Sequence, residues 1–100
     1  MWQPITADNL DALVTEQLRA CSSAQQAAFA RYRVPFYAVP IHRLGSVEWV
    51  FVVAEFASGV LYYEDVEEGF EVSALGADGS IPNRGCNQYE LRHVLAHLGL

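Results

Sequence analysis

VEWVFVVAEFA, at residues 47–57, is the most strand-like stretch of this 100-residue chain. It consists mainly of β-branched and aromatic residues, which are enriched in strands. Alternate residues of a strand point to opposite faces of its sheet. The two faces are Val47, Trp49, Phe51, Val53 and Glu55, and Glu48, Val50, Val52, Ala54 and Phe56. Because both faces are mostly apolar, we expect a central strand that is at least partly covered on both sides.

Further strand signals lie on either side of this stretch. Residues 34–43 are rich in strand formers but contain Pro35 and Pro40. Proline cannot donate a hydrogen bond to a neighbouring strand, so these residues predict an edge strand. Residues 60–65 and 70–75 predict two more strands, and the connections at 44–46, 58–59 and 66–69 are short turns. Parallel neighbours would need long crossovers, so the pattern predicts a four-stranded antiparallel meander.

Helical patterns flank these strands. Apolar residues recur at helical spacing from Leu10 to Tyr32, after a helix start at Thr6. Ser23 and Gln26 can cap a second helix, so one kinked helix and two separate helices are both open. A loop over 76–85 precedes a last helix, which we expect to run from a cap at Asn87 to a stop at Gly99. Helices on one face of an antiparallel sheet define an α+β fold, here one domain over residues 1–100.

The composition is that of a globular domain. Hydrophobic residues make up 52% of the chain and charged residues 18%, which excludes a disordered chain. No signal peptide or membrane-spanning run is visible, so we expect a cytoplasmic protein with reduced thiols and no membrane contact. The residues expected in the core are Leu13, Val14, Leu18, Cys21, Phe51, Val53, Leu91 and Leu95.

The formal net charge is −6, and its distribution is uneven. Residues 44–78 contain eight acidic residues and no basic one, whereas the segments on either side are each close to neutral. An acidic surface repels phosphate backbones, so nucleic-acid binding is disfavoured. A basic protein partner is compatible with this surface.

An acidic hairpin follows the central strand and carries Glu64, Asp65, Glu67, Glu68 and Glu71. Strand alternation places the first two on opposite faces and the next two in the turn, so the carboxylates do not converge on a metal site. They form either a solvated hairpin, a protein-binding patch or, paired with Arg43 or Arg84, a structural feature. Exposed aromatic residues beside carboxylates are typical of a protein-binding surface. The residues assigned to this partner surface are Trp49, Tyr62, Tyr63, Glu64, Asp65, Glu67 and Glu68. The alternatives are that the loop over 76–85 or a second subunit covers the aromatic residues.

His93 and His97 are four residues apart, a spacing that can present two imidazoles to zinc, with Cys86 as a third ligand or as a nucleophile. The glutamate of the zinc metalloprotease motif is absent, and no third group orients the thiol. We therefore expect two histidines on the polar face of the last helix, no metal, no cofactor and no catalysis. A metal or thiol enzyme that uses these three residues is kept as an alternative.

The segment YEDVEEGF at residues 63–70, followed by Cys86, Asn87 and Gln88 before a helix, resembles a family of small bacterial proteins with a hairpin of this kind. That family carries no assigned function. The chain is also loosely similar, in size, acidity and fold class, to the immunity proteins of bacterial toxin systems. From the acidic hairpin and the aromatic residues we expect a non-catalytic binding protein with a basic partner, and the similarity to immunity proteins implies a role against a toxin. The remaining alternative is a homodimer that pairs through the second face of the sheet.

Overall fold

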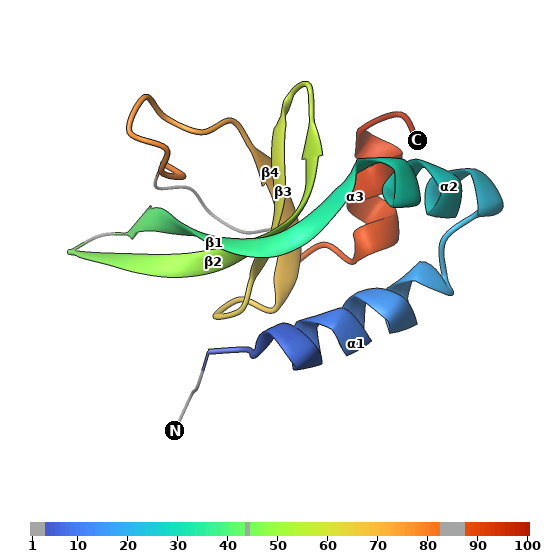
Figure 1. Cartoon of the computed structure of the whole chain (residues 1–100), viewed down its shortest axis with the longest axis horizontal. Helices are drawn as coiled ribbons and strands as arrows, with labels where there is room; N and C mark the ends of the chain where they lie inside the picture. Colours follow the sequence, from blue (N-terminus) through green and yellow to red (C-terminus); the bar gives the residue numbers. More distant parts are fainter. Residues whose placement is uncertain (1–3, 44, 83–87) are drawn as a thin grey trace.

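The computed structural model describes residues 4–43, 45–82 and 88–100. Within them the elements are α1 (Ala7–Leu18), α2 (Ser23–Tyr32), β1 (Arg33–Arg43), β2 (Ser46–Phe56), β3 (Gly59–Glu64), β4 (Gly69–Ser73) and α3 (Leu91–His97). The four strands form one antiparallel sheet in the order β1-β2-β3-β4. The helices gather at one end of the sheet, and the β1–β2 hairpin extends beyond them (Figure 1). The predicted α+β fold and the meander are confirmed.

The N-terminal helical region is two helices. The Thr6 hydroxyl accepts the backbone N–H of Asn9 at 3.1 Å and caps α1. Ser22 and Gln25 form a reciprocal capping box at the start of α2. This cap satisfies two backbone donors that a helix start leaves without partners. Of the two alternatives left open, two separate helices are present, and the cap of the second lies one residue earlier than the expected Ser23.

The last helix begins later than predicted. Tyr89 still forms an antiparallel bridge with Phe70 of β4, and its carbonyl accepts the Phe70 N–H at 2.8 Å. This pairing keeps the chain extended up to Glu90, which is the N-cap of α3. The predicted cap, Asn87, lies outside the described residues and cannot cap a helix that starts at Leu91.

Both edges of the sheet are bridged by single residues from the segment after β4. Ile81 bridges to Ile41 on the outer side of β1, where its N–H donates to the Pro40 carbonyl at 2.8 Å. The Pro40 carbonyl points away from β2, and so does its nitrogen, which carries no hydrogen. The proline therefore removes no hydrogen bond between β1 and β2. Tyr89 bridges the opposite edge at β4. The prediction that β1 is an edge strand is confirmed.

A β-bulge interrupts the alternation of β2. The pairing with β3 runs from Val52 opposite Tyr62 directly to Ala54 opposite Leu61, so Val53 is the extra residue. A bulge of one residue reverses which side chains face each side of the sheet. The strict alternation predicted for this strand is wrong beyond Val53: Ala54 joins the helix-facing side, and Glu55 is exposed.

Two hydrophobic clusters fill the two sides of the sheet. The larger one lies against the helices and consists of Leu10, Val14, Cys21, Phe29, Val53, Ala54, Leu61, Tyr63, Phe70, Leu91, Val94 and Leu95. The smaller one lies on the second face and consists of Val39, Ile41, Val50, Val52, Val60, Tyr62 and Ile81. Five of the expected core residues are buried, whereas Leu13, Leu18 and Phe51 are half-buried against the larger cluster.

The second face of the sheet is covered by the chain itself. Ile81 is fully buried there, beside Ile41 and Tyr62. The segment from which it comes, after β4, lies across the sheet from α1 (Figure 1). The two alternatives for this face were a covering loop and a second subunit, and the loop is present at Ile81. The homodimer hypothesis needs this face to be open, and at Ile81 it is not.

Candidate protein-binding surface

The two most exposed large apolar side chains of the described residues lie at the start of β2. Trp49 is 63% exposed and Val47 is 53% exposed. Pro40 of β1 pairs with Trp49, and Ala38 pairs with Phe51 on the same side. These residues lie near the turn between β1 and β2, where no helix covers the sheet. We call the uncovered surface formed by Ala38, Pro40, Val47 and Trp49 the open end of the hairpin. Such a group of apolar residues on a small chain marks a candidate binding surface.

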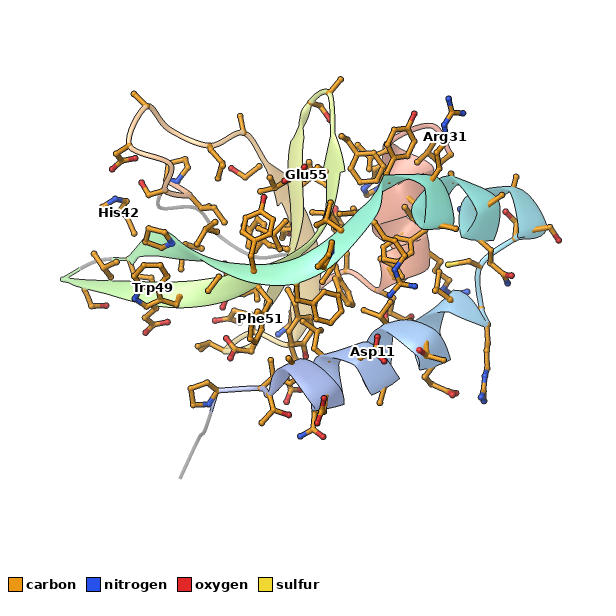
Figure 2. All side chains as sticks on the ribbon, viewed as in Figure 1. Asp11, Arg31, His42, Trp49, Phe51 and Glu55 are labelled. Atoms are coloured by element: carbon orange, nitrogen blue, oxygen red, sulfur yellow. The ribbon has the colours of Figure 1, made fainter. Side chains whose placement is uncertain are left out.

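The open end exists because the helices stop short of it. It lies on the same side of the sheet as Phe51, which packs against the helix-facing cluster. Phe51 lies over α1, whereas Trp49 lies further out along the hairpin (Figure 2). Beyond the start of α1, the extended residues Pro4 and Ile5 are the last described part of the chain on this side.

Asp65 attaches this extended segment to the hairpin. Its Oδ2 accepts the backbone N–H of Ile5 at 3.1 Å. Burial raises the pKa of the Asp65 carboxyl, and the Ile5 N–H opposes that rise. The segment from Pro4 to Ile5 is thereby fixed beside β3, at the edge of the open end.

A hollow of about 160 Å³ lies between this segment and Trp49. Its lining residues are Pro4, Ile5, Ala38, Trp49, Val50, Phe51, Tyr63 and Asp65. Seven of these are apolar or aromatic, and one is a carboxylate. Ligand pockets for small molecules usually have volumes of about 300–1,000 Å³, so this hollow is of the size of one side chain.

Acidic residues extend from this hollow over the turn between β3 and β4. Glu67 and Glu68 are exposed, and Glu68 has a φ of 57°. Glu68 also lines a second hollow, next to the first, together with Pro4, Ile5 and Asp65. The open end therefore has carboxylates on its β3–β4 side.

Three of the residues assigned to the partner surface are buried instead. Tyr62 is 1% exposed and packs under Ile81, and Tyr63 is 7% exposed and packs against Phe70 with ring centroids 5.0 Å apart and ring planes inclined by 58°. Glu64 is 1% exposed. Each side of the sheet is covered where β3 passes through it, so the expected exposure of these three residues is wrong, although Tyr63 still lines the hollow beside Trp49. Trp49, Glu67 and Glu68 are exposed and Asp65 is half-buried.

Glu64 is instead part of an ion-pair network on the second face. Arg43 at the end of β1 forms an ion pair with Glu64, and its Nε donates to Glu48 Oε2 at 2.6 Å. The pairing with Glu64 is the main cause that raises the pKa of the Arg43 guanidinium above its ordinary value. The structural alternative for the hairpin carboxylates therefore holds for Glu64, with Arg43 as its partner. Arg84, the other candidate, lies outside the described residues.

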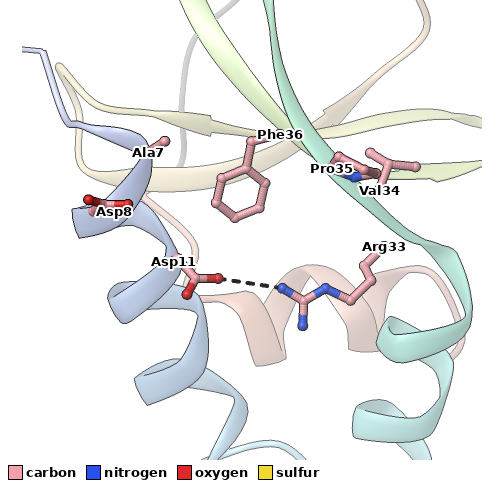
Figure 3. Close-up of a pocket in the computed structure, with 7 residues that line it drawn as sticks. All are labelled: Ala7, Asp8, Asp11, Arg33, Val34, Pro35 and Phe36. Atoms are coloured by element: carbon pink, nitrogen blue, oxygen red, sulfur yellow. Dashed lines mark ion pairs between the residues drawn. The ribbon is translucent and has the colours of Figure 1, made fainter.

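A larger hollow, of about 580 Å³, separates α1 from the start of β1. Phe36 points into it, and Asp11 Oδ1 lies 3.7 Å from Arg33 Nη2 across it (Figure 3). Asp8 and Ala7 complete the α1 side. The charged residues that line this hollow are Asp8, Asp11 and Arg33, and the last two pair with each other.

The candidate metal and thiol residues do not form a group in the described part of the chain. Residues 4–43, 45–82 and 88–100 contain no cluster of three or more His, Cys, Asp or Glu side chains that could hold a metal ion. His93 Nδ1 accepts the backbone N–H of Glu90 at 3.2 Å, and the ring of His97 lies edge-on to Tyr89 with centroids 4.8 Å apart. Cys86 lies outside the described residues. Cys21 is buried in the helix-facing cluster, and burial raises the pKa of its thiol.

Pro4, Ile5 and Pro40 belong to the candidate surface, and the sequence analysis did not assign them to it. No local pattern marks them, because they meet Trp49 only through the tertiary fold.

No protein-family model, curated protein or solved structure matches this chain. In the described residues, no helix is long and apolar enough to cross a membrane.

Proposed function

We propose that this chain is a non-catalytic protein-binding module and that the open end of the hairpin, with the acidic turn beside it, contacts a basic protein partner. The observation that carries the proposal is the exposure of Trp49 beside a hollow of side-chain size. Tryptophan is among the residues most often found at the energetic centre of protein interfaces, where it is surrounded by a polar rim. Here Glu67, Glu68 and Asp65 supply that rim.

The charge of the chain supports a basic partner. The net charge is −6, and Glu67 and Glu68 are exposed within the acidic segment. The nearest arginine along the hairpin, Arg43, is paired with two carboxylates on the other face and does not neutralise this side. Complementary charges at the rim of an interface act mainly by accelerating association.

An immunity-like role against a toxin is the specific form of this proposal. The resemblance in size, acidity and fold class favours it, since a small acidic domain can occupy a basic functional surface of another protein. The two other hypotheses have less support. The enzyme hypothesis needs Cys86, which lies outside the described residues. The homodimer hypothesis would bring two chains of charge −6 together through a face that Ile81 already covers.

The test is a capture of partners by the immobilised chain, followed by kinetics with the purified partner. Trp49→Ala is compared with Leu75→Ala, a control that truncates another exposed apolar side chain, 38% exposed, after β4. Removal of an interface hot spot costs about 2 kcal/mol or more, so Trp49→Ala should weaken binding by about 30-fold or more. Leu75→Ala should leave the affinity unchanged. Equal effects of the two variants would contradict the proposed surface.

The acidic rim is tested separately. Glu67→Gln with Glu68→Gln should slow association with the partner several-fold at low salt, and the difference should shrink as salt screens charges beyond about 10 Å at 0.1 M. The matched control is Asp8→Asn with Glu16→Gln, which removes two exposed acidic charges from α1. An association rate that is unchanged at every salt concentration would show that the acidic turn serves solubility only.

A further inference from the structure

We infer that the hollow beside Trp49 receives an arginine side chain of the basic partner, which stacks on the indole and reaches the Asp65 carboxylate. This inference rests on the proposed function, because it names the group that the open end recognises. It starts from the size of the hollow. About 160 Å³ is too small for a typical free ligand but suits one long side chain.

The walls of the hollow select a cation with an apolar or planar surface. Trp49, Phe51 and Tyr63 line it together with Ile5 and Pro4. A cation over the face of an aromatic ring is attracted by the ring electrons, and tryptophan is the strongest of the three aromatic side chains in this respect. Trp49 is 63% exposed, so its indole is accessible to a partner.

Among the described residues that line the hollow, one is charged, and its charge is negative. Asp65 is half-buried, and burial raises the pKa of its carboxyl. A carboxylate that has lost part of its hydration interacts more strongly with an incoming cation than an exposed carboxylate does. Glu68 lies in the neighbouring hollow and adds to the negative field. No arginine lines either hollow in the described part of the chain.

Arginine fits these walls better than lysine. Its guanidinium is planar, stacks on aromatic rings and is more weakly hydrated than an ammonium group. It also carries five N–H donors, so a stacked guanidinium can still donate to a carboxylate at the edge of the ring. Lysine would have to give up a strongly bound hydration shell for one point contact.

The experiment uses the full-length ¹⁵N-labelled chain and needs no partner. Nα-acetyl-arginine amide is titrated, with Nα-acetyl-citrulline amide as an uncharged probe of nearly the same shape and Nα-acetyl-lysine amide as the second cation. The readout is the indole N–H signal of Trp49, assigned by its loss in Trp49→Phe. We expect saturable shifts in the millimolar range with the arginine probe, and binding of the citrulline and lysine probes that is weaker by about tenfold, equivalent to about 1.4 kcal/mol.

Asp65→Asn should weaken binding of the arginine probe by a similar factor, whereas Asp8→Asn on α1 should not change it. Asparagine keeps an oxygen that can accept the Ile5 N–H, and the ¹⁵N spectrum reports whether the variant is folded. Equal shifts with citrulline, stronger binding of lysine, an unmoved Trp49 indole signal or full binding by folded Asp65→Asn would each overturn the inference. If the arginine probe fails while Trp49→Ala still weakens partner binding, the inference fails and the proposed function stands. If the probe binds and Trp49→Ala leaves partner binding unaffected, the hollow binds arginine, but the proposed function fails and so does the assignment of that arginine to the partner.

Discussion

The two ends of β2 have similar composition and opposite surroundings. Val53 and Ala54, towards the end of the strand, are fully buried against the helices, whereas Val47 and Trp49, at its start, are more than half exposed. The difference is one of coverage, because the helices lie over one end of the sheet and the hairpin extends past them (Figure 1). Apolar residues at the covered end stabilise the fold by leaving water. Those at the open end contribute little to folding, so their contact area remains available for a partner.

The largest effect on the unfolding free energy is expected at the ion pair of Arg43 and Glu64, which lies on the second face of the sheet, opposite the open end. Arg43→Met leaves Glu64, which is 1% exposed, without its cation. Removal of one partner of a buried pair costs about 3–5 kcal/mol, and we expect a loss in that range in urea unfolding. Glu64→Gln should cost less, because Arg43 keeps Glu48. Arg43→Met combined with Glu64→Leu should recover a large part of the loss; no recovery would mean that the charge of Glu64 is not the cause.

At the covered end, Leu95→Ala should cost about 2–5 kcal/mol of unfolding free energy, because Leu95 is fully buried against the sheet. Thermal and urea unfolding measure the change. Leu75→Ala, at an exposed site, serves as the control for leucine truncation itself. An unchanged melting temperature for Leu95→Ala would show that α3 does not pack as described.

Tyr37 offers a smaller, pH-dependent test on the second face. Its hydroxyl donates to Glu55 Oε2 at 2.6 Å, and burial together with this bond raises its pKa to about 12 from 10.0. The folded state therefore holds this proton more tightly than the unfolded state, so its contribution is complete below pH 10 and is lost as the pH rises towards 12. Tyr37→Phe should lose stability less steeply than the wild type over this interval. Parallel stability curves for the two proteins would contradict the described bond.

The smallest effect on the unfolding free energy is expected for Trp49→Ala, and this variant tests the comparison of the two ends of β2 directly. Trp49→Ala should change the unfolding free energy by no more than about 0.5 kcal/mol, as is usual for surface positions. Val53→Ala, four residues further along the same strand, should lose a substantial part of the about 1.5–3 kcal/mol that burial of a valine contributes. If the two variants destabilise equally, the open end is part of the core and the comparison fails.

Local signals predicted most of the fold. The β-branched runs and short turns predicted four strands, whereas the caps at Ser23 and Gln26 left open whether the N-terminal region is one kinked helix or the two helices α1 and α2. The features that the sequence did not predict depend on contacts between distant residues. Tyr89 delays α3 by pairing with Phe70, and Gly69 permits this approach because a Cβ there would lie 2.5 Å from the Gln88 Cα.

The candidate surface was predicted only in part, for the same reason. The exposure of Glu67 and Glu68 could be inferred from their position in a turn, whereas the strand pattern placed Trp49 on the same face as Phe51 and Val53 and left its exposure open. The burial of Tyr62 depends on Ile81, and that of Glu64 on Arg43, two strands away. Strand alternation indicates which face a residue points to, but it does not indicate what covers that face.

The bridges at Ile81 and Tyr89 have a consequence for how the protein forms in the cell. Until these two residues reach the sheet, the outer edges of β1 and β4 present unpaired backbone groups to any other strand. Synthesis proceeds from the N-terminus, so all four strands leave the ribosome before either bridging residue does. Chains cut short before Ile81 would leave the Pro40 carbonyl and the His42 and Phe70 N–H groups without these partners, at positions where a strand of another chain could pair with them.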